Sequence, residues 1–232
     1  MRLYKYLLIM LLLGALVRLV HPSVTVENLN GDVRIRRGMS ETWESARQGE
    51  ELDLLDTILT GEGRVVLKRS DGSTFTLGSN SILDISELRS ISRREMFLYV
   101  MSQKVQNIKT DGDSSKLQNP NVTAVHGEKK SGQTVQAAKL DKWLLELNAA
   151  RAMLDQELYP NSVIKCHKIL NRYSDIHDCG TVSYTLGRSF EQLDEPGQAI
   201  DHYQKAIAQS QLCRQSIEWE EQARQAIDRL SR

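Results

Sequence analysis

From about Val24 onward, the first hundred residues carry short apolar runs that alternate with polar positions and are separated by turn residues. A period of two within such runs predicts β-strands. Pairs such as Asn30-Gly31 and Asp71-Gly72 favour tight turns between neighbouring strands. The pattern therefore predicts an antiparallel all-β domain over residues 23–127. Its expected strands are Val24-Thr25-Val26, Val33-Arg34-Ile35, Thr57-Ile58-Leu59, Val65-Val66-Leu67, Phe75-Thr76-Leu77 and Ile82-Leu83-Asp84-Ile85.

The same alternation predicts which side chains of this domain face inward. The inward set consists of large apolar residues at every second position: Val65, Leu67, Phe75, Leu77, Leu83 and Ile85. The intervening positions are expected to face water or a sheet edge: Arg64, Lys68, Thr74 and Thr76. Trp43 is expected to cover the β core as a lid.

The period of the pattern changes near residue 130. Residues 128–136 are polar and short of large apolar side chains, which is typical of a linker. Beyond them, apolar residues recur at intervals of three and four, the spacing of a helix that buries one face. Pro160 is expected to end the first helix, and a last helix is expected over residues 211–230. We therefore expect an all-α domain over residues 137–232 and an α+β fold made of two modules.

The second helical hairpin resembles the tetratricopeptide repeat. Small and aromatic residues stand at the spacing of that repeat: Leu186-Gly187, Phe190, Ala199, Tyr203 and Ala206. The preceding residues match the same positions less completely, with Asn161 or Ser162 expected to cap a helix that ends near Tyr173. Two repeats fall below the three that a free-standing array needs, so the helices are expected to dock against the β domain or onto another protein. A fragment of residues 138–232 is accordingly expected to unfold without a sharp transition.

The repeat-like pattern also predicts a face for a binding partner, because the first helices of successive hairpins line one surface of such an array. The resemblance places eight side chains there: Leu147, Arg151, Leu154, Asp155, Tyr184, Arg188, Glu191 and Gln192. Arg151 and Arg188 are the candidates for binding a carboxylate of a protein or peptide. The alternative interpretation is a solvated helix face.

The start of the chain has the layout of a secretory signal peptide. Arg2 and Lys5 precede an apolar run of 12 residues from Tyr6 to Val17. Such a run spans about 18 Å as a helix, less than the roughly 30 Å hydrocarbon core of a bilayer. Residues 1–22 are therefore expected to be a signal peptide or, since no clear cleavage site is present, an uncleaved N-terminal anchor. The rest is expected to be exported to the periplasm or cell envelope, with membrane contact only through this segment if it stays attached.

Export changes the interpretation of the cysteines, because disulfides persist outside the cytosol. Cys166, Cys179 and Cys213 lack the spacing of a zinc site. They are either buried small apolar residues or one disulfide with a third, free thiol. The two pairings considered are Cys166 with Cys179 and Cys179 with Cys213.

Taken in order, residues of the β domain resemble the FecR domain, an extracytoplasmic module of many exported bacterial proteins. The matching segments are Gly31-Asp32-Val33-Arg34-Ile35-Arg36, Trp43 with Gly49 and Leu52, Asp56-Thr57-Ile58 with Thr60-Gly61, Val65-Val66-Leu67, Asp71-Gly72-Ser73, Asn80-Ser81 and the closing strand 119–127. His126 and Leu55 depart from the family pattern, which usually has Arg and Gly there. The resemblance implies a β domain that contacts protein, peptidoglycan or another glycan.

Composition narrows the function classes. The 30 Lys and Arg balance the 30 Asp and Glu, so the net charge of zero argues against a nucleic-acid partner. The sequence lacks the common hydrolase, phosphate-loop, dinucleotide and zinc-protease motifs, so no catalytic residue, cofactor or metal is expected. We therefore expect a non-catalytic bacterial envelope protein that acts as a binding or scaffold adaptor. The alternative is a periplasmic sensory or regulatory subunit that relays a signal to a membrane partner.

Overall fold

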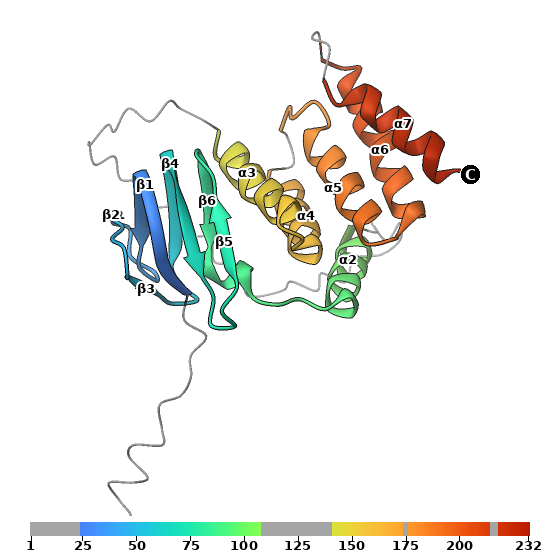
Figure 1. Ribbon diagram of the computed structural model, residues 1–232. Helices are drawn as coiled ribbons and strands as arrows, with labels where there is room; N and C mark the ends of the chain where they lie inside the picture. The colour runs from blue at the N-terminus through green and yellow to red at the C-terminus, as the bar shows by residue number, and fades with distance from the viewer. Residues whose placement is uncertain (1–23, 108–140, 174–175, 214–217) are drawn as a thin grey trace, which may run out of the picture. The chain divides into compact units, whose positions relative to one another are not determined.

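The computed structural model describes residues 24–107, 141–173, 176–213 and 218–232. The chain divides into two compact units, Met1–Arg89 and Ser90–Arg232. Within the described ranges, the first unit contains a six-stranded antiparallel sheet and the second contains six α-helices (Figure 1). The predicted α+β fold of two modules is confirmed. The predicted leader 1–22, closing strand 119–127 and linker 128–136 lie outside the described residues.

Two long antiparallel strands, β1 (Val24–Arg36) and β4 (Thr57–Lys68), form the middle of the sheet. Four short strands extend this pair: β2 (Glu44–Ser45), β3 (Glu51–Leu52), β5 (Thr74–Leu77) and β6 (Ser81–Asp84). β2 and β6 flank one end of the long pair, and β3 and β5 flank the other. Each end is therefore a four-stranded half-sheet, and a 3₁₀ helix, η1 (Ile85–Leu88), follows β6.

β1 and β4 each combine two of the predicted strands into one. The prediction of a hairpin turn at Asn30-Gly31 is therefore wrong. Gly31 instead lies opposite Gly63 in the middle of the paired strands. Its φ angle is +81°, and a Cβ atom there would lie 2.1 Å from the carbonyl oxygen of Glu62. Glycine is needed because the two backbones approach closely. Register shifts on both sides of Gly31 are bulges, which bend the strands between the two half-sheets.

The interior of the sheet agrees with the predicted alternation. All six side chains predicted to face inward are at most 1% exposed. Arg64, Lys68 and Thr74 are exposed, and Thr76 is half-buried. Trp43 is half-buried, with the Arg36 guanidinium carbon 5.3 Å from the centre of its ring.

Asp56, one of the residues that resemble the FecR pattern, is buried at the start of β4. Its Oδ2 atom accepts hydrogen bonds from Arg37 Nη1 at 2.6 Å and from the backbone N–H of Asp53 at 2.9 Å. Its Oδ1 atom accepts from the backbone N–H of Gly38 at 2.9 Å. Arg37 also forms an ion pair with Glu50. One carboxylate therefore connects the chain after β1 with the turn before β4.

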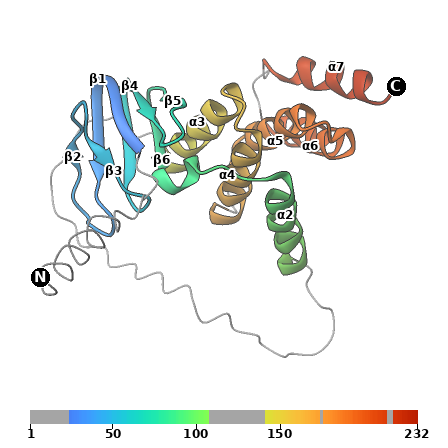
Figure 2. The same cartoon turned by 60° about the horizontal axis from the view of Figure 1, so that its bottom comes forward.

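The second unit begins with a helix that the pattern did not predict, α2 (Arg93–Asn107). This helix falls within residues 23–127, which were assigned to the β domain. Met96 and Val100 of α2 are buried in the apolar cluster of the helical unit, and α2 packs on α4 (Figure 2). The β unit therefore ends near Arg89, earlier than the predicted boundary.

The remaining helices are α3 (Lys142–Asp155), α4 (Tyr159–Arg172), α5 (Thr181–Gln192), α6 (Pro196–Ser210) and α7 (Glu220–Leu230). Consecutive helices pack on each other through the whole series. Pro160 does not end α3 but lies in the first turn of α4, where its fixed φ and missing N–H are tolerated. Asn161 and Ser162, the predicted caps, are buried within α4. α7 begins at Glu220, later than the expected start of the last helix.

The close approach of α5 and α6 follows the predicted spacing of small and aromatic residues. A Cβ atom at Gly187 of α5 would lie 2.6 Å from the ring of Tyr203 of α6. Tyr203 is buried, and its hydroxyl donates a hydrogen bond to Glu191 Oε2 at 2.6 Å. Because Gly187 has no side chain, the Tyr203 ring fills the space that a side chain would occupy there.

Cys179 and Cys213 form a disulfide with their Cα atoms 5.9 Å apart, which confirms one of the two pairings considered. The bond joins the segment before α5 to the segment after α6, so it closes the second helical hairpin. Cys166 is free and fully buried in α4. Burial raises the pKa of its thiol to about 12, so the thiol stays protonated and unreactive at neutral pH.

Candidate partner-binding face

The predicted face lies on α3 and α5, which contact each other directly. Two of its eight predicted residues, Leu147 and Leu154, are buried rather than exposed. They share one side of α3 with Ala150, because residues three, four and seven apart lie on the same side of a helix. That side packs into the helical unit. The structure therefore removes both leucines from the surface that a partner could reach.

Arg151 is the half-buried cation among the remaining residues. Within the described residues, its guanidinium has no hydrogen bond or ion pair. Burial is the largest influence on the Arg151 pKa and lowers it; the charge of Arg188 acts in the same direction, and that of Asp155 opposes it. A partly desolvated cation thus stands between a carboxylate and a second cation, and the effect of the carboxylate is the larger.

The exposed residues of the predicted face are Asp155, Arg188 and Gln192. Arg188 Nη2 lies 4.0 Å from Asp155 Oδ1, at the outer limit of an ion pair, and both side chains are well exposed. Exposed pairs of this kind contribute about 0–1 kcal/mol. The pair can therefore open at little cost, which leaves Arg188 available to a ligand.

Glu191 is already occupied by contacts within the unit. Its Oε2 atom accepts the hydrogen bond from Tyr203, and its Oε1 atom accepts one from Arg229 of α7. The carboxylate therefore connects α5 to both α6 and α7. We assign Glu191 to holding these helices together and not to contact with a partner.

Tyr184 brings α7 to the edge of the face. Its ring stacks on Trp219 with ring centres 4.7 Å apart, and its hydroxyl donates to Gln222 Oε1 at 2.6 Å. Burial raises the pKa of Tyr184. Trp219 and Gln222 were not predicted, because the last helix was interpreted only as a cap. A Trp directly before a helix rich in polar residues was the available signal.

Five residues thus remain of the predicted set: Arg151, Asp155, Tyr184, Arg188 and Gln192. We call them the α3/α5 face. It offers two guanidinium groups beside a flat aromatic side chain. This combination suits a carboxylate attached to an extended chain.

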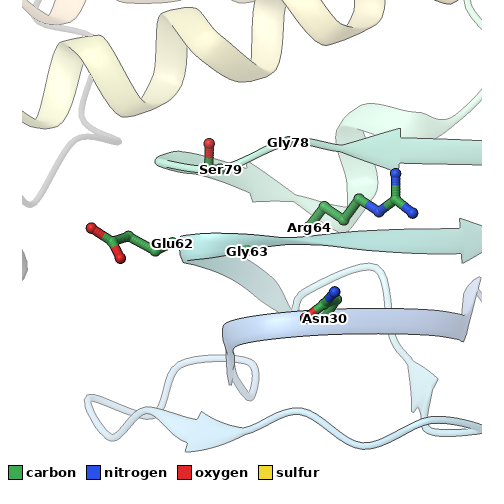
Figure 3. Close-up of a pocket in the computed structure, with 6 residues that line it drawn as sticks. All are labelled: Asn30, Glu62, Gly63, Arg64, Gly78 and Ser79. Atoms are coloured by element: carbon green, nitrogen blue, oxygen red, sulfur yellow. The ribbon is translucent and has the colours of Figure 1, made fainter.

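A shallow hollow of about 500 Å³ lies on the β unit, lined by Asn30, Glu62, Gly63, Arg64, Gly78 and Ser79. Figure 3 shows the carboxylate of Glu62 and the guanidinium of Arg64 pointing in opposite directions along β4. The polar groups therefore do not converge on one point. The hollow offers polar contacts spread over the strand surface.

A smaller pocket of about 270 Å³ lies in the helical unit between α2 and the α5–α6 connection. Its apolar lining residues are Met96, Phe97, Val100 and Phe190, and its polar ones are Arg93, Arg94, Glu195 and Gln198. Across the part of the chain that the structure describes, no three His, Cys, Asp or Glu side chains gather as metal ligands would. Over the same part, no helix is long and apolar enough to cross a bilayer.

Comparisons with known proteins add little to these observations. No protein-family model matches the chain, and no curated protein is significantly similar to it. A solved structure described as "Cell surface anchoring domain" is 22% identical, with 31% of this chain and 96% of its own chain covered, at a TM-score of 0.28. A TM-score this low does not transfer a fold or a function, so the chain's own residues and contacts carry the argument.

Proposed function

We propose that this chain is a non-catalytic adaptor of the bacterial cell envelope, in which a FecR-like β domain is joined to a short tetratricopeptide-like helical array. The array binds a protein or peptide through the α3/α5 face. The observation that carries this proposal is the Arg151 guanidinium, which is half-buried and unpaired within the described residues.

The half-buried position of Arg151 carries an energetic cost. Partly burying a cation removes water that would otherwise solvate it, and this loss is the largest effect on Arg151; the charge of Asp155 outweighs the repulsion from Arg188. A carboxylate of a partner that reaches Arg151 replaces part of the lost solvation. Paired guanidinium and carboxylate groups also form short, charge-assisted hydrogen bonds. The Tyr184 ring beside them supplies apolar contact for the residue that carries the carboxylate.

The proposed location is outside the cytoplasm. The disulfide between Cys179 and Cys213 supports it, because the cytosol keeps most protein thiols reduced. The layout of residues 1–22 supports the same conclusion from the sequence. The β domain is proposed to contact protein or glycan, and the hollow around Asn30, Glu62 and Arg64 is its candidate polar surface.

The test uses a library of labelled peptides that end in a free carboxylate, with matched peptides that end in an amide. Binding to the full chain is measured by fluorescence anisotropy. We expect Arg151→Glu to weaken the selected peptides by at least about tenfold, which corresponds to 1.4 kcal/mol. Amidation of the same peptides is expected to weaken them similarly, since it removes the group that the two arginines bind.

Lys205→Glu is the matched control, because Lys205 is an exposed cation on α6, outside the α3/α5 face. It applies the same change of charge to the same unit. Circular dichroism checks that each variant remains folded. Equal binding by the wild type and by Arg151→Glu, or equal binding of acid and amide peptides, contradicts the proposed face.

A further inference from the structure

Helix α2 has an apolar side that the helical unit does not cover. Seven large apolar side chains are exposed in the described part of the chain, and three of them lie on this one helix. Phe97 is 54% exposed, Leu98 58% and Met101 40%. The other four are dispersed: Met39, Leu54, Leu55 and Leu212. The exposed apolar surface is therefore concentrated on α2.

Helical spacing separates the two sides of α2. Met96 and Val100, four residues apart, face the apolar cluster, and Gln103 accepts a hydrogen bond from Asn171 of α4 on that side. Phe97 and Met101 are also four apart, and Leu98 and Met101 are three apart, so these three form an exposed stripe beside the buried side. Phe97 stands at the border of the two, because it also lines the pocket that Met96 and Val100 line. We call Phe97, Leu98 and Met101 the outer stripe.

Basic residues stand directly before the outer stripe. Arg93 and Arg94 are exposed, lie four residues before Phe97 and Leu98, and form no ion pair within the part of the chain described. Glu195, directly before α6, is the acidic residue that lines the 270 Å³ pocket together with Arg93 and Arg94. The hydroxyl of Ser102, beside the stripe, donates to the backbone carbonyl of Tyr99 at 2.7 Å, so it needs no water as a partner. Contact with an apolar medium therefore leaves this hydroxyl satisfied.

The small size of the outer stripe and the basic residues beside it favour a lipid over a protein as its partner. A large side chain offers about 150–250 Å², and about half is exposed here, which gives roughly 300 Å² in total. A specific protein interface buries about 800 Å² on each side. A few apolar side chains beside basic residues are instead sufficient for shallow insertion at the surface of a bilayer, where contacts add to other anchors.

We propose that α2 lies on an anionic phospholipid surface, with Phe97, Leu98 and Met101 in the interface and Arg93 and Arg94 on lipid phosphates. Basic side chains and anionic headgroups attract each other over about a Debye length, so they hold the helix where its apolar side can insert. This contact is separate from the α3/α5 face and from any contact made by the N-terminal segment.

The test places an environment-sensitive fluorophore at Leu98→Cys in the full chain. Cys166 is buried and the other two cysteines are paired, so the new thiol is the one that reacts. Vesicles of phosphatidylcholine with phosphatidylglycerol are compared with vesicles of phosphatidylcholine alone. With the anionic vesicles we expect a blue shift, a severalfold rise in intensity and quenching by spin labels on the acyl chains.

The label at Leu212→Cys is the matched control, because Leu212 is an exposed apolar residue of the same unit. The fluorophore at position 212 is expected to stay in water when vesicles are added. If only the N-terminal segment binds the vesicles, neither label enters the bilayer and neither gives a signal. Arg93→Gln with Arg94→Gln is expected to weaken the vesicle affinity at least tenfold, while Lys205→Gln leaves it unchanged. Met101→Cys provides a second labelling position if the first variant folds poorly.

Three results overturn the proposal. The first is a label at Leu98 and Met101 that vesicles do not change. The second is an equal response to neutral and anionic vesicles. The third is a blue shift without vesicles that rises with protein concentration or with added envelope protein, which assigns the outer stripe to a second copy or a protein partner. None of these results affects the peptide-binding test of Arg151.

Discussion

At the scale of single residues, the Asp56 carboxylate illustrates how a sequence pattern can reflect structure rather than chemistry. Burial alone acts to raise the pKa of Asp56, but the backbone N–H groups of Asp53 and Gly38 and the Arg37 guanidinium outweigh it, so the pKa lies below its usual value. The pairing likewise raises the pKa of Arg37, against the effect of burial. Asp56 therefore stabilises the fold through its charged form.

Replacing Asp56 by Asn should destabilise the β unit by about 2–3 kcal/mol, because the carboxamide presents an NH₂ group to one of three hydrogen-bond donors. The effect depends on pH in a definite direction. A depressed native pKa adds stability above the unfolded pKa of about 3.9, and this is lost as pH falls through the native value. The difference between wild type and Asp56→Asn should be constant above about pH 5 and shrink below about pH 4.

The measurement is amide hydrogen exchange of β1 and β4, which reports on the β unit alone. Asp32→Asn is the control, because Asp32 is an exposed carboxylate that also pairs with an arginine, Arg34. Its effect should be about 0–1 kcal/mol. A difference between wild type and Asp56→Asn that persists unchanged down to pH 2.5 contradicts a role for the charged carboxylate.

The sequence pattern identified candidate residues for the site. It did not predict which of them the fold buries or pairs with other side chains. Arg151, Tyr184 and Arg188, which the spacing assigned to the face, lie at exposed or half-buried positions. The spacing did not separate Leu147 from them, because a helix packed on two neighbours buries more than one narrow stripe. Glu191 was predicted as a contact for a partner, whereas its links to Tyr203 and Arg229 depend on residues 12 and 38 positions away.

At the scale of elements, the alternation of apolar and polar residues identified the strand segments. It did not show that two successive segments form one continuous strand. A Gly between two apolar runs is compatible with a turn or with a bulge in a continuous strand. At Gly31, the pairing with Gly63 on the opposite strand shows that the strand continues. Helix α2 was missed for a related reason. Its run from Met96 to Met101 is continuously apolar, so its periodicity does not separate a helix from a strand.

The disulfide is an element-scale constraint with a measurable contribution. Cys179 and Cys213 are 34 residues apart, and closing such a loop in the unfolded chain contributes about 4 kcal/mol in the loop-entropy description. We expect Cys179→Ser with Cys213→Ser to destabilise the helical unit by about 2–4 kcal/mol. Thermal unfolding followed by far-ultraviolet circular dichroism measures this loss.

Reductant provides the internal control for the disulfide. It should lower the melting temperature of the wild type to that of the double variant and leave the double variant unchanged. Cys166 contributes nothing to this effect, since its thiol is buried and unpaired with sulfur. A wild type that melts at the same temperature with and without reductant contradicts the expected contribution.

At the scale of the whole molecule, the chain builds two separate cores from two kinds of pattern. The β unit buries alternating residues of paired strands, and the helical unit buries one cluster to which α2 contributes Met96 and Val100. The short array was expected to need an additional packing partner. Helix α2 supplies part of that packing. The polar residues before α3 marked a change of pattern, but the change of unit lies at Arg89.

This assignment of α2 predicts which of its substitutions affect folding. Met96→Ser with Val100→Ser removes two buried apolar side chains, each worth about 1.5–3 kcal/mol, so it should lower the stability of the helical unit by about 3–6 kcal/mol. Leu98→Ser with Met101→Ser changes two exposed side chains of the same helix and should alter stability by less than about 1 kcal/mol. Amide exchange in α3 to α7 separates these effects from any change in the β unit. A fragment of residues 138–232, which lacks α2, should show the same loss as the first variant, and a sharp, undiminished transition in that fragment contradicts a structural role for α2.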